Sequence, residues 1–321
     1  EQEYQKFAFF SLDRNLKVRE VFEKGESTAD IIMALSAISQ VDITPGDTLV
    51  VLDEIQDCPK ALEALKFFCE ETPDIHIIVA GSLLGLSLHN GVSYPVGKVE
   101  ELRLYPMSFL EFLNAMNKTQ LLSILKSKNW TVINMLEKDL ISLLRQYYYV
   151  GGMPAAVLAH AEQKGLQEVR SIQQQILADY RRDFSKHAPA REVPRINMVW
   201  DSIPAQLAKE NKKFIYGAVK KSARAVDFEM GIQWLIDAGL AYKVIRVNAP
   251  RLPLKFYEDT DAFKLFMLDV GLMGAMTETP AEAMLVGDNV FSEYKGAFTE
   301  LYVFTQLKAL GMSLYYHSIS N

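Results

Sequence analysis

Short apolar runs alternate with amphipathic segments in the first third of the chain. Each run is apolar on both faces and contains β-branched or aromatic residues, which is typical of a strand buried in a parallel sheet. The runs cover residues 7–12, 48–52 and 76–80. Residues 27–39 and 60–71 lie between them and are predicted helices. In the second, Leu62, Leu65 and Phe68 form one apolar stripe. This order predicts an α/β fold with a parallel sheet.

The pattern changes after residue 98. Residues 99–104 are predicted to form a fourth strand, and a largely helical stretch follows to about residue 187. Two helical pieces, a helix stop at Gly239 and the alternating residues 240–247 then predict a helix–helix–hairpin unit. A long helix over 292–310 precedes the strand-like residues 313–316. The predicted divisions are a parallel-sheet domain (1–110), a helical region (111–203), a winged-helix-like region (204–254) and a partial α/β region (255–321).

Charge is unevenly distributed along the chain, although the overall composition is that of an ordinary globular protein. The 34 Lys and Arg residues against 40 Asp and Glu residues give a net charge of −6. Residues 1–110 carry −9, residues 111–250 carry +7 and residues 251–321 carry −4. The basic middle favours contact with a polyanion, and the alternative is a neutral average over solvated faces.

The composition also limits the class of protein. No run approaches eighteen uncharged apolar residues, so no membrane-spanning helix is expected. Two cysteines, Cys58 and Cys69, are too few for a disulfide framework and fit a reducing compartment. The first residues carry no secretion signal. These features predict a cytoplasmic protein and exclude a uniformly basic nucleic-acid binder and a disordered acidic chain.

Two adjacent carboxylates, Asp53 and Glu54, directly follow the second apolar run. In a P-loop ATPase, a buried strand carries an Asp to its carboxyl end, where it helps hold Mg²⁺ on the phosphates of ATP. A Glu directly after it polarises the attacking water. The alternative is a helix N-cap in which both carboxylates serve the helix dipole. Ser82 follows the next run, where such ATPases sense the γ-phosphate, and its alternative role is to cap the next turn.

The phosphate-binding loop that such a site needs does not occur in the printed sequence, which contains no G-x-x-x-x-G-K-[ST] string. Residues 91–99 come nearest, but they have five spacers instead of four and Val99 at the hydroxyl position. We therefore reject them as a phosphate-binding loop. The run 7–12 corresponds to the second strand of such a fold, so the first strand and its loop are expected before residue 1.

Several short strings occur in order along the chain. They include Asp-Glu-Ile-Gln at 53–56, Ala-Gly-Ser-Leu-Leu-Gly at 80–85, Leu-Tyr-Pro-Met-Ser-Phe at 104–109, Val-Gly-Gly-Met-Pro at 150–154, Leu-Asp-Val-Gly-Leu at 268–272 and Lys-Gly-Ala-Phe-Thr-Glu at 295–300. Together they resemble a prokaryotic family of predicted AAA-like ATPases. The resemblance implies an N-terminal P-loop domain, a helical region, a winged-helix-like segment and a C-terminal region similar to restriction-endonuclease folds.

The resemblance also implies roles for individual residues. Asp53 would be the magnesium aspartate, Glu54 the catalytic glutamate and Ser82 the sensor, with ATP and Mg²⁺ as cofactors. Glu300 corresponds to the first metal carboxylate of the nuclease-like fold, whose other ligands would follow residue 321. A buried or capping role is the favoured alternative for Glu300.

A basic cluster lies between residues 209 and 224, where six Lys and Arg residues accompany one acidic residue. Lysines at the start of a helix in a winged-helix arrangement can neutralise DNA phosphates. The candidate DNA-binding residues are Lys212, Lys213, Lys220, Lys221 and Arg224. The alternative is a solvated basic face on a module that packs between domains.

Four arginines, at positions 181, 182, 191 and 195, cluster just before this region. In a homo-oligomer, an arginine of a neighbouring copy can stabilise charge on the γ-phosphate. Salt bridges with Asp179, Asp183 and Glu192 are the favoured alternative.

The leading hypothesis is an ATP-binding protein, a Mg²⁺-dependent ATP hydrolase that couples nucleotide state to a DNA-binding C-terminal half. A second hypothesis is a DNA-binding or regulatory module with a vestigial nucleotide site. A third is a DNA-cleaving enzyme that uses the nuclease-like region. All three place the protein in solution, without a membrane partner.

Overall fold

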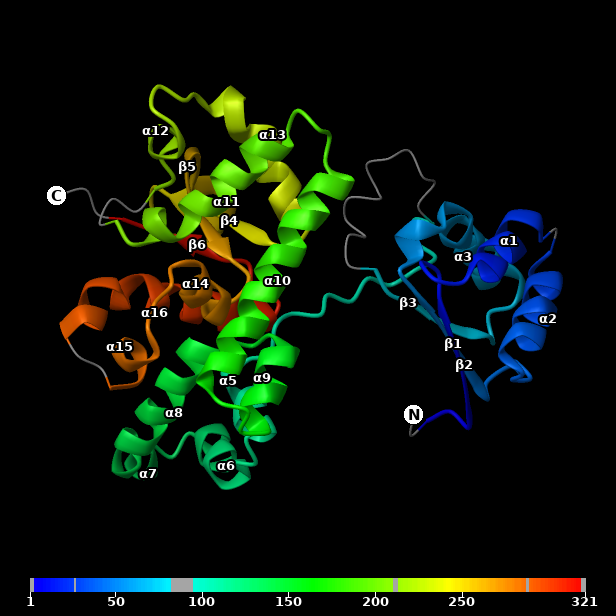
Figure 1. Ribbon diagram of the computed structural model, residues 1–321, viewed down its shortest axis with the longest axis horizontal. Helices are drawn as coiled ribbons and strands as arrows, with labels where there is room; N and C mark the ends of the chain where they lie inside the picture. Colours follow the sequence, from blue (N-terminus) through cyan, green and yellow to red (C-terminus); the bar gives the residue numbers. More distant parts are fainter. Residues whose placement is uncertain (1–2, 26, 82–94, 210–212, 287–288, 319–321) are drawn as a thin grey trace. The chain divides into compact units, whose positions relative to one another are not determined.

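The computed structural model describes residues 3–25, 27–81, 95–209, 213–286 and 289–318, with residues 289–294 described by their backbone alone (Figure 1). The chain divides into two compact units, Glu1–Arg103 and Leu104–Asn321. We call them unit 1 and unit 2. The finer divisions at 203/204 and 254/255 stay predictions.

Unit 1 is a parallel three-stranded sheet with helical connections. Its elements are β1 (Lys6–Ser11), α1 (Leu16–Lys24), α2 (Thr28–Ser39), β2 (Thr48–Asp53), the short 3₁₀ turn η1 (Ile55–Asp57), α3 (Pro59–Glu71) and β3 (His76–Val79). The strand order is β1-β2-β3, and both pairs are parallel. The predicted α/β class and the first three predicted strands are therefore confirmed. The helix α1 was not predicted.

The core of unit 1 lies on one face of this sheet. Ala8, Phe10, Val50 and Leu52 point to that face, and α1, α2 and α3 cover it with residues such as Phe68 (Figure 1). The strand period of two sends the intervening residues to the other face. There Phe7, Phe9 and Ile78 are 47%, 52% and 54% exposed. One face of the sheet thus holds the core, and the other presents apolar side chains among the described residues.

The fourth strand predicted over residues 99–104 is wrong. This segment has no strand pairing, and Leu102 and Leu104 are 86% and 100% exposed. Val99 packs against the core of unit 1. The segment reaches the border between the two units at residue 103/104, so it serves as a connection, and no described strand pairs with it.

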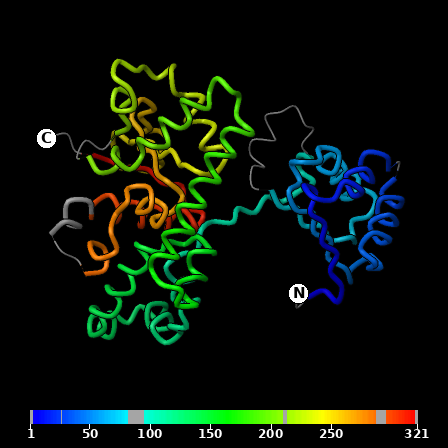
Figure 2. Tube along the Cα trace, in the orientation of Figure 1, coloured from blue at the N-terminus to red at the C-terminus, as the bar shows by residue number. Residues whose placement is uncertain are grey.

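Unit 2 begins with seven helices and continues with a small sheet surrounded by helices. The first set is α5 (Phe109–Ala115), α6 (Thr119–Ser127), α7 (Trp130–Met135), α8 (Glu137–Val150), α9 (Pro154–Ala161), α10 (Leu166–His187) and α11 (Val193–Leu207). The second set is α12 (Tyr216–Val219), α13 (Ala225–Asp237), β4 (Ala241–Val247), β5 (Glu258–Met267), α14 (Val270–Met276), α15 (Ala281–Val286), α16 (Asn289–Ala309) and β6 (Tyr315–Tyr316). Figure 2 follows this path from green to red.

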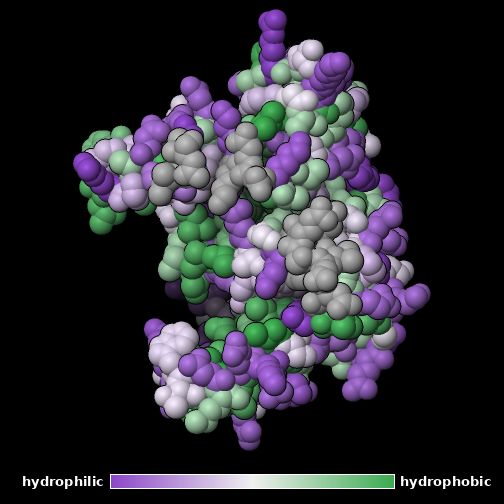
Figure 3. All heavy atoms as spheres, turned by 90° about the vertical axis from the view of Figure 1, so that its left-hand side faces the viewer, coloured by the Kyte–Doolittle hydropathy of each residue, from purple (hydrophilic) through white to green (hydrophobic). Residues whose placement is uncertain are grey.

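The sheet of unit 2 has the order β5-β4-β6. β4 and β5 form an antiparallel hairpin, and β6 lies parallel to β4 on its other edge. The helices α12 and α13 precede the hairpin directly, in the order expected from the sequence. On the face shown in Figure 3, apolar side chains gather in the hollows, and hydrophilic ones project around them.

Asp269, the N-cap residue of α14, lies in the interior of unit 2, with 2% of its surface exposed. Its carboxylate accepts hydrogen bonds from the backbone N–H of Leu272 (2.8 Å) and of Gly152 (2.6 Å). Burial raises the pKa of Asp269 to about 6. The carboxylate therefore joins the start of α14 to the turn between α8 and α9.

The glycines of that turn leave no room for a side chain. Gly151 has φ +73° and ψ −165°, a region that is essentially restricted to glycine. A Cβ atom on Gly151 would lie 2.2 Å from Asp269 Oδ1, and one on Gly152 would lie 2.1 Å from the carbonyl oxygen of Met107. The strings at 104–109, 150–154 and 268–272 thus meet at one tightly packed place.

Polar side chains from other helices complete this centre. Gln173 of α10 is fully buried and donates to two carbonyls at the end of α8, both at 2.8 Å. The Tyr147 hydroxyl donates to the Met107 carbonyl (2.6 Å) and accepts from Gln306 of α16 (3.2 Å). Because buried polar groups are costly when unpaired, this network fixes the relative positions of α8, α10 and α16.

Candidate functional site

The carboxyl ends of the three parallel strands meet at one edge of unit 1. The register pairs Ser11 of β1 with Asp53 of β2, and Leu52 of β2 with Val79 of β3. Asp53 is the last residue of the central strand, and its carbonyl accepts from the N–H of Leu12 (2.9 Å). The predicted carboxylates therefore lie between the ends of the two outer strands.

Glu54 turns the chain sharply at this edge. Its φ of 54° lies in the left-handed region, which is uncommon for a residue with a side chain. The next residue, Ile55, is fully buried, and its N–H donates to the carbonyl of Ala80 after β3 (3.0 Å). The N–H of Glu54 donates to Asp53 Oδ1 (3.1 Å). The strained backbone at Glu54 is thus held in place by the burial of Ile55 and by its hydrogen bond. Strained residues that are held in this way are often found at functional sites.

The capping alternative for the two carboxylates is not what the structure contains. Glu54 is the N-cap of η1, yet its side chain makes no capping hydrogen bond. The following helix, α3, starts at Pro59 with Cys58 as its N-cap. The Glu54 carboxylate instead accepts a hydrogen bond from the side-chain amide of Gln56.

Gln56 connects Glu54 to the end of the third strand. Its Oε1 is buried and has no hydrogen-bond partner among the described residues. A Cβ atom on Gly81 would lie 2.5 Å from this oxygen. The Gln56 side chain therefore occupies space that a side chain at residue 81 would fill. Sequence reasoning did not single out Gln56, although it lies in the Asp-Glu-Ile-Gln string. Ser82, the predicted sensor, lies outside the described residues.

A third carboxylate at this edge, Asp13, was also missed. The Ser11 hydroxyl at the end of β1 donates to the Asp13 carboxylate, and this hydrogen bond holds the pKa of Asp13 below its usual range. The guanidinium of Arg19 donates to the carbonyls of Leu12 and Asp13, which fixes the loop. The available signal was an Asp shortly after an apolar run, the same signal that identified Asp53.

These residues suit a magnesium site in which the protein supplies only a few of the ligands. Within the described part of the chain, no three His, Cys, Asp or Glu side chains lie close enough together to enclose a metal ion. Mg²⁺ at nucleotide sites commonly takes one or two carboxylates and receives its other ligands from phosphates and water. The half-buried Asp53 at the strand end matches that donor set.

The basic cluster lies around α12 in unit 2. Lys213, Lys220, Lys221 and Arg224 are all exposed, and none of them forms an ion pair with a described residue. Lys212 lies outside the described residues. The neighbouring helix α13 exposes Val226 and Met230, which are 74% and 63% accessible. Lys220, Lys221 and Arg224 are thus exposed cations without an ion pair among the described residues, beside an apolar part of α13.

The other charged candidates are explained by ion pairs. Arg182 pairs with Asp179 (3.0 Å) and Arg195 with Glu192 (2.9 Å), which confirms the salt-bridge alternative for these two. Arg191 also pairs with Glu192, and Arg181 pairs with Asp201 instead of a predicted partner.

Glu300 is neither a cap nor a buried residue, so the favoured alternative for it is wrong. It lies in the middle of α16, its side chain is 40% exposed, and it pairs with the buried Lys264. The physical reason is that Lys264 points from β5 toward α16, and a buried ammonium group needs a counter-charge.

In the part of the chain that the structure describes, no helix combines the length and the apolar character needed to cross a bilayer.

Comparisons with known proteins divide the chain in a similar way. Residues 1–113 match the model of a family described as AAA domain, and residues 141–283 match a domain of unknown function, DUF8612. No match was found among curated proteins.

Two solved structures are similar to the chain. A Walker-type ATPase of Pyrococcus abyssi, Paby2304, is 10% identical with a TM-score of 0.46, covering 85% of this chain and 84% of its own. The Orc1 protein of Aeropyrum pernix in complex with DNA is 14% identical with a TM-score of 0.30, covering 87% and 79%. The family match over residues 1–113 supports an ATP-binding P-loop domain of the AAA type in the N-terminal part of the chain.

Proposed function

We propose that the protein is a Mg²⁺-dependent ATP hydrolase whose catalytic carboxylates lie in unit 1. One observation carries this proposal. Asp53 and Glu54 stand at the carboxyl end of the central parallel strand, and the Glu54 side chain is held by Gln56 instead of capping a helix. Ligands of open parallel α/β sheets bind at this edge.

The proposed roles follow from the chemistry of each side chain. Asp53 would hold Mg²⁺, which when bound neutralises charge on the ATP phosphates. Glu54 accepts the proton of the attacking water, and the Gln56 amide keeps the carboxylate oriented for that task. Ser82 is assigned as the γ-phosphate sensor from its position after the third strand.

The test of this function is ATP turnover by the complete protein, including any residues that precede position 1. We expect turnover that requires Mg²⁺. Replacing Asp53 by Asn should lower the rate about 100-fold at low Mg²⁺, because the replaced carboxylate contributes several kcal/mol through the ion. The measurement is phosphate release against Mg²⁺ concentration, with Asp57→Asn as the control in the same turn. An Asp53→Asn rate equal to that of the wild type would contradict the assignment.

A second candidate function is DNA binding by unit 2, with the nucleotide unit either coupled to it or vestigial. The exposed cations Lys213, Lys220, Lys221 and Arg224 support it; the last three form no ion pair with any described residue. The lysines and arginine of this cluster can contact phosphates, so we expect binding to be governed by phosphate contacts and not by the reading of bases. A homo-oligomer that supplies an arginine in trans remains part of the proposal for the ATPase.

The DNA-binding candidate predicts a salt effect. Replacing Lys220, Lys221 and Arg224 by Ala is expected to reduce the slope of log affinity against log salt by about 3, because each phosphate contact adds about 0.9. Fluorescence anisotropy with duplex DNA at several salt concentrations measures the slope. Replacing Lys118, Lys126 and Lys128, exposed lysines on and beside α6, is the charge-matched control. An equal loss in both triple variants would argue for net charge alone.

A further inference from the structure

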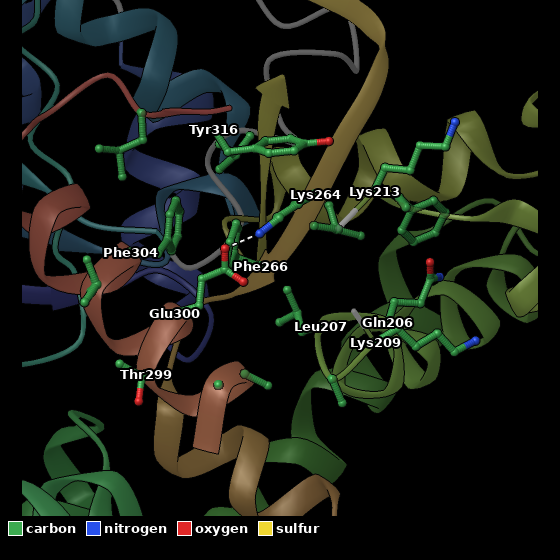
Figure 4. A pocket seen from close by; sticks show the side chains of 18 of the residues that line it. Gln206, Leu207, Lys209, Lys213, Lys264, Phe266, Thr299, Glu300, Phe304 and Tyr316 are labelled. Carbon is green, nitrogen blue, oxygen red and sulfur yellow. Dashed lines mark hydrogen bonds and ion pairs between the residues drawn. The ribbon is translucent and has the colours of Figure 1, made fainter. Parts of the chain in front are cut away.

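A cavity of unit 2 lies between α16, the β4–β5–β6 sheet and the end of α11. Its volume is about 810 Å³, within the range of small-molecule sites. Figure 4 shows Gln206 and Lys209 on one side of it and Glu300, Thr299 and Phe304 on the other. Apolar side chains, including Phe266 and Phe304, form much of the wall.

A buried lysine stands in this cavity. The Lys264 side chain is 5% exposed, and its ammonium group pairs with the Glu300 carboxylate. The same ammonium group lies 5.1 Å from the centre of the Tyr316 ring and 5.9 Å from that of Phe266 (Figure 4). Glu300 remains 40% exposed, so it is free to turn toward solvent when another anion approaches Lys264.

The charge of the cavity wall is strongly positive. Lys209, Lys213 and Lys295 line it together with Lys264, and Glu300 is the one acidic side chain among the described lining residues. Four ammonium groups against one carboxylate attract an anion and repel a metal cation.

The Tyr316 side chain lines the same cavity with its ring. Its hydroxyl oxygen is buried and has no hydrogen-bond partner in the part of the chain that the structure describes. Burial raises the pKa of Tyr316, so the hydroxyl keeps its proton at neutral pH.

We propose that this cavity binds a small organic anion, with its charged head at Lys264 and its apolar body against Phe266 and Phe304. The cavity recognises the ligand by charge at one end and by apolar contact along the wall. Glu300 competes with the ligand for Lys264, so it sets the affinity. This site is independent of the carboxylates in unit 1.

The test uses three probes with unbranched ten-carbon alkyl or acyl chains, whose head groups are negative, neutral and positive. Isothermal titration of the complete protein is expected to show one decanoate bound per chain, about tenfold or more tighter than decan-1-ol, and no binding of decyltrimethylammonium. Higher salt should weaken decanoate binding and leave the alcohol unchanged. Equal affinities for the carboxylate and the alcohol would overturn the proposal.

Variants separate this site from nonspecific binding. Lys264→Met should weaken decanoate binding about tenfold or more, and Lys213→Met at the exposed rim should weaken it severalfold without disturbing the core. Glu300→Gln should strengthen it, because the competing carboxylate is gone. Lys221→Met, outside the cavity, is the matched control. The proposal fails if Lys213→Met and Glu300→Gln both bind decanoate like the wild type, whatever the stability of Lys264→Met.

Discussion

Replacing Glu54 by Gln is expected to lower ATP turnover by at least about 100-fold while ATP binding persists. A positioned general base typically contributes a factor of about 10² to 10⁴, and the amide of Gln has no basic oxygen to accept the proton of water. The two side chains have nearly the same size. The left-handed turn at Glu54, which depends on the buried Ile55 and its hydrogen bond to Ala80, should therefore survive the change.

The measurement compares single-turnover hydrolysis with equilibrium binding of a fluorescent ATP analogue. Glu63→Gln is the matched control, since Glu63 is a half-buried carboxylate of α3 that pairs with Lys60. Loss of turnover with retained binding, in Glu54→Gln alone, supports the role of the base. Equal turnover in wild type and Glu54→Gln would show that Glu54 does not act in the chemical step, even if Asp53 still proved essential.

Unit 1 could be predicted well because its chemistry follows from local pattern. A strand buried in a parallel sheet is typically apolar on both faces, so residues 48–52 predict both the strand and the position of Asp53 at its end. The helix α1 was not predicted because it has only two buried residues, Val18 and Phe22, among charged neighbours. Asp13 was missed because the sequence does not show that β1 lies next to β2. This pairing is what brings Asp13 to the same edge of the sheet as Asp53.

Unit 2 could be predicted only in outline, because its key contacts join residues far apart in the sequence. Asp269 reaches Gly152, which is 117 residues away, and Lys264 reaches Glu300 from a different element. No periodicity signals such pairs. The segment 99–104 was misjudged for the opposite reason, since its apolar residues favour a strand locally while the fold offers no partner strand.

The second prediction concerns the stability of unit 2 and the tightly packed turn at Gly151. Gly151→Ala is expected to destabilise unit 2 by about 4 kcal/mol or more. The new Cβ would lie 2.2 Å from Asp269 Oδ1 on a backbone that only glycine adopts readily, and Asp269 cannot move without losing its bonds to Gly152 and Leu272. The free energy of unfolding in urea, followed by tryptophan fluorescence, measures it, because Trp130, Trp200 and Trp234 all lie in unit 2.

Gly239→Ala separates backbone strain from the clash. Gly239 has φ +72°, close to that of Gly151, but a Cβ atom there would meet nothing within 4 Å. This variant should lose only about 1–2 kcal/mol, the ordinary penalty of a left-handed residue with a side chain. The difference between the two variants then reports the packing of the 150–154 turn against Asp269 together with the extra backbone strain of Gly151 at ψ −165°. Equal losses in both would mean that the turn relaxes freely and that Asp269 does not hold the helices of unit 2 together.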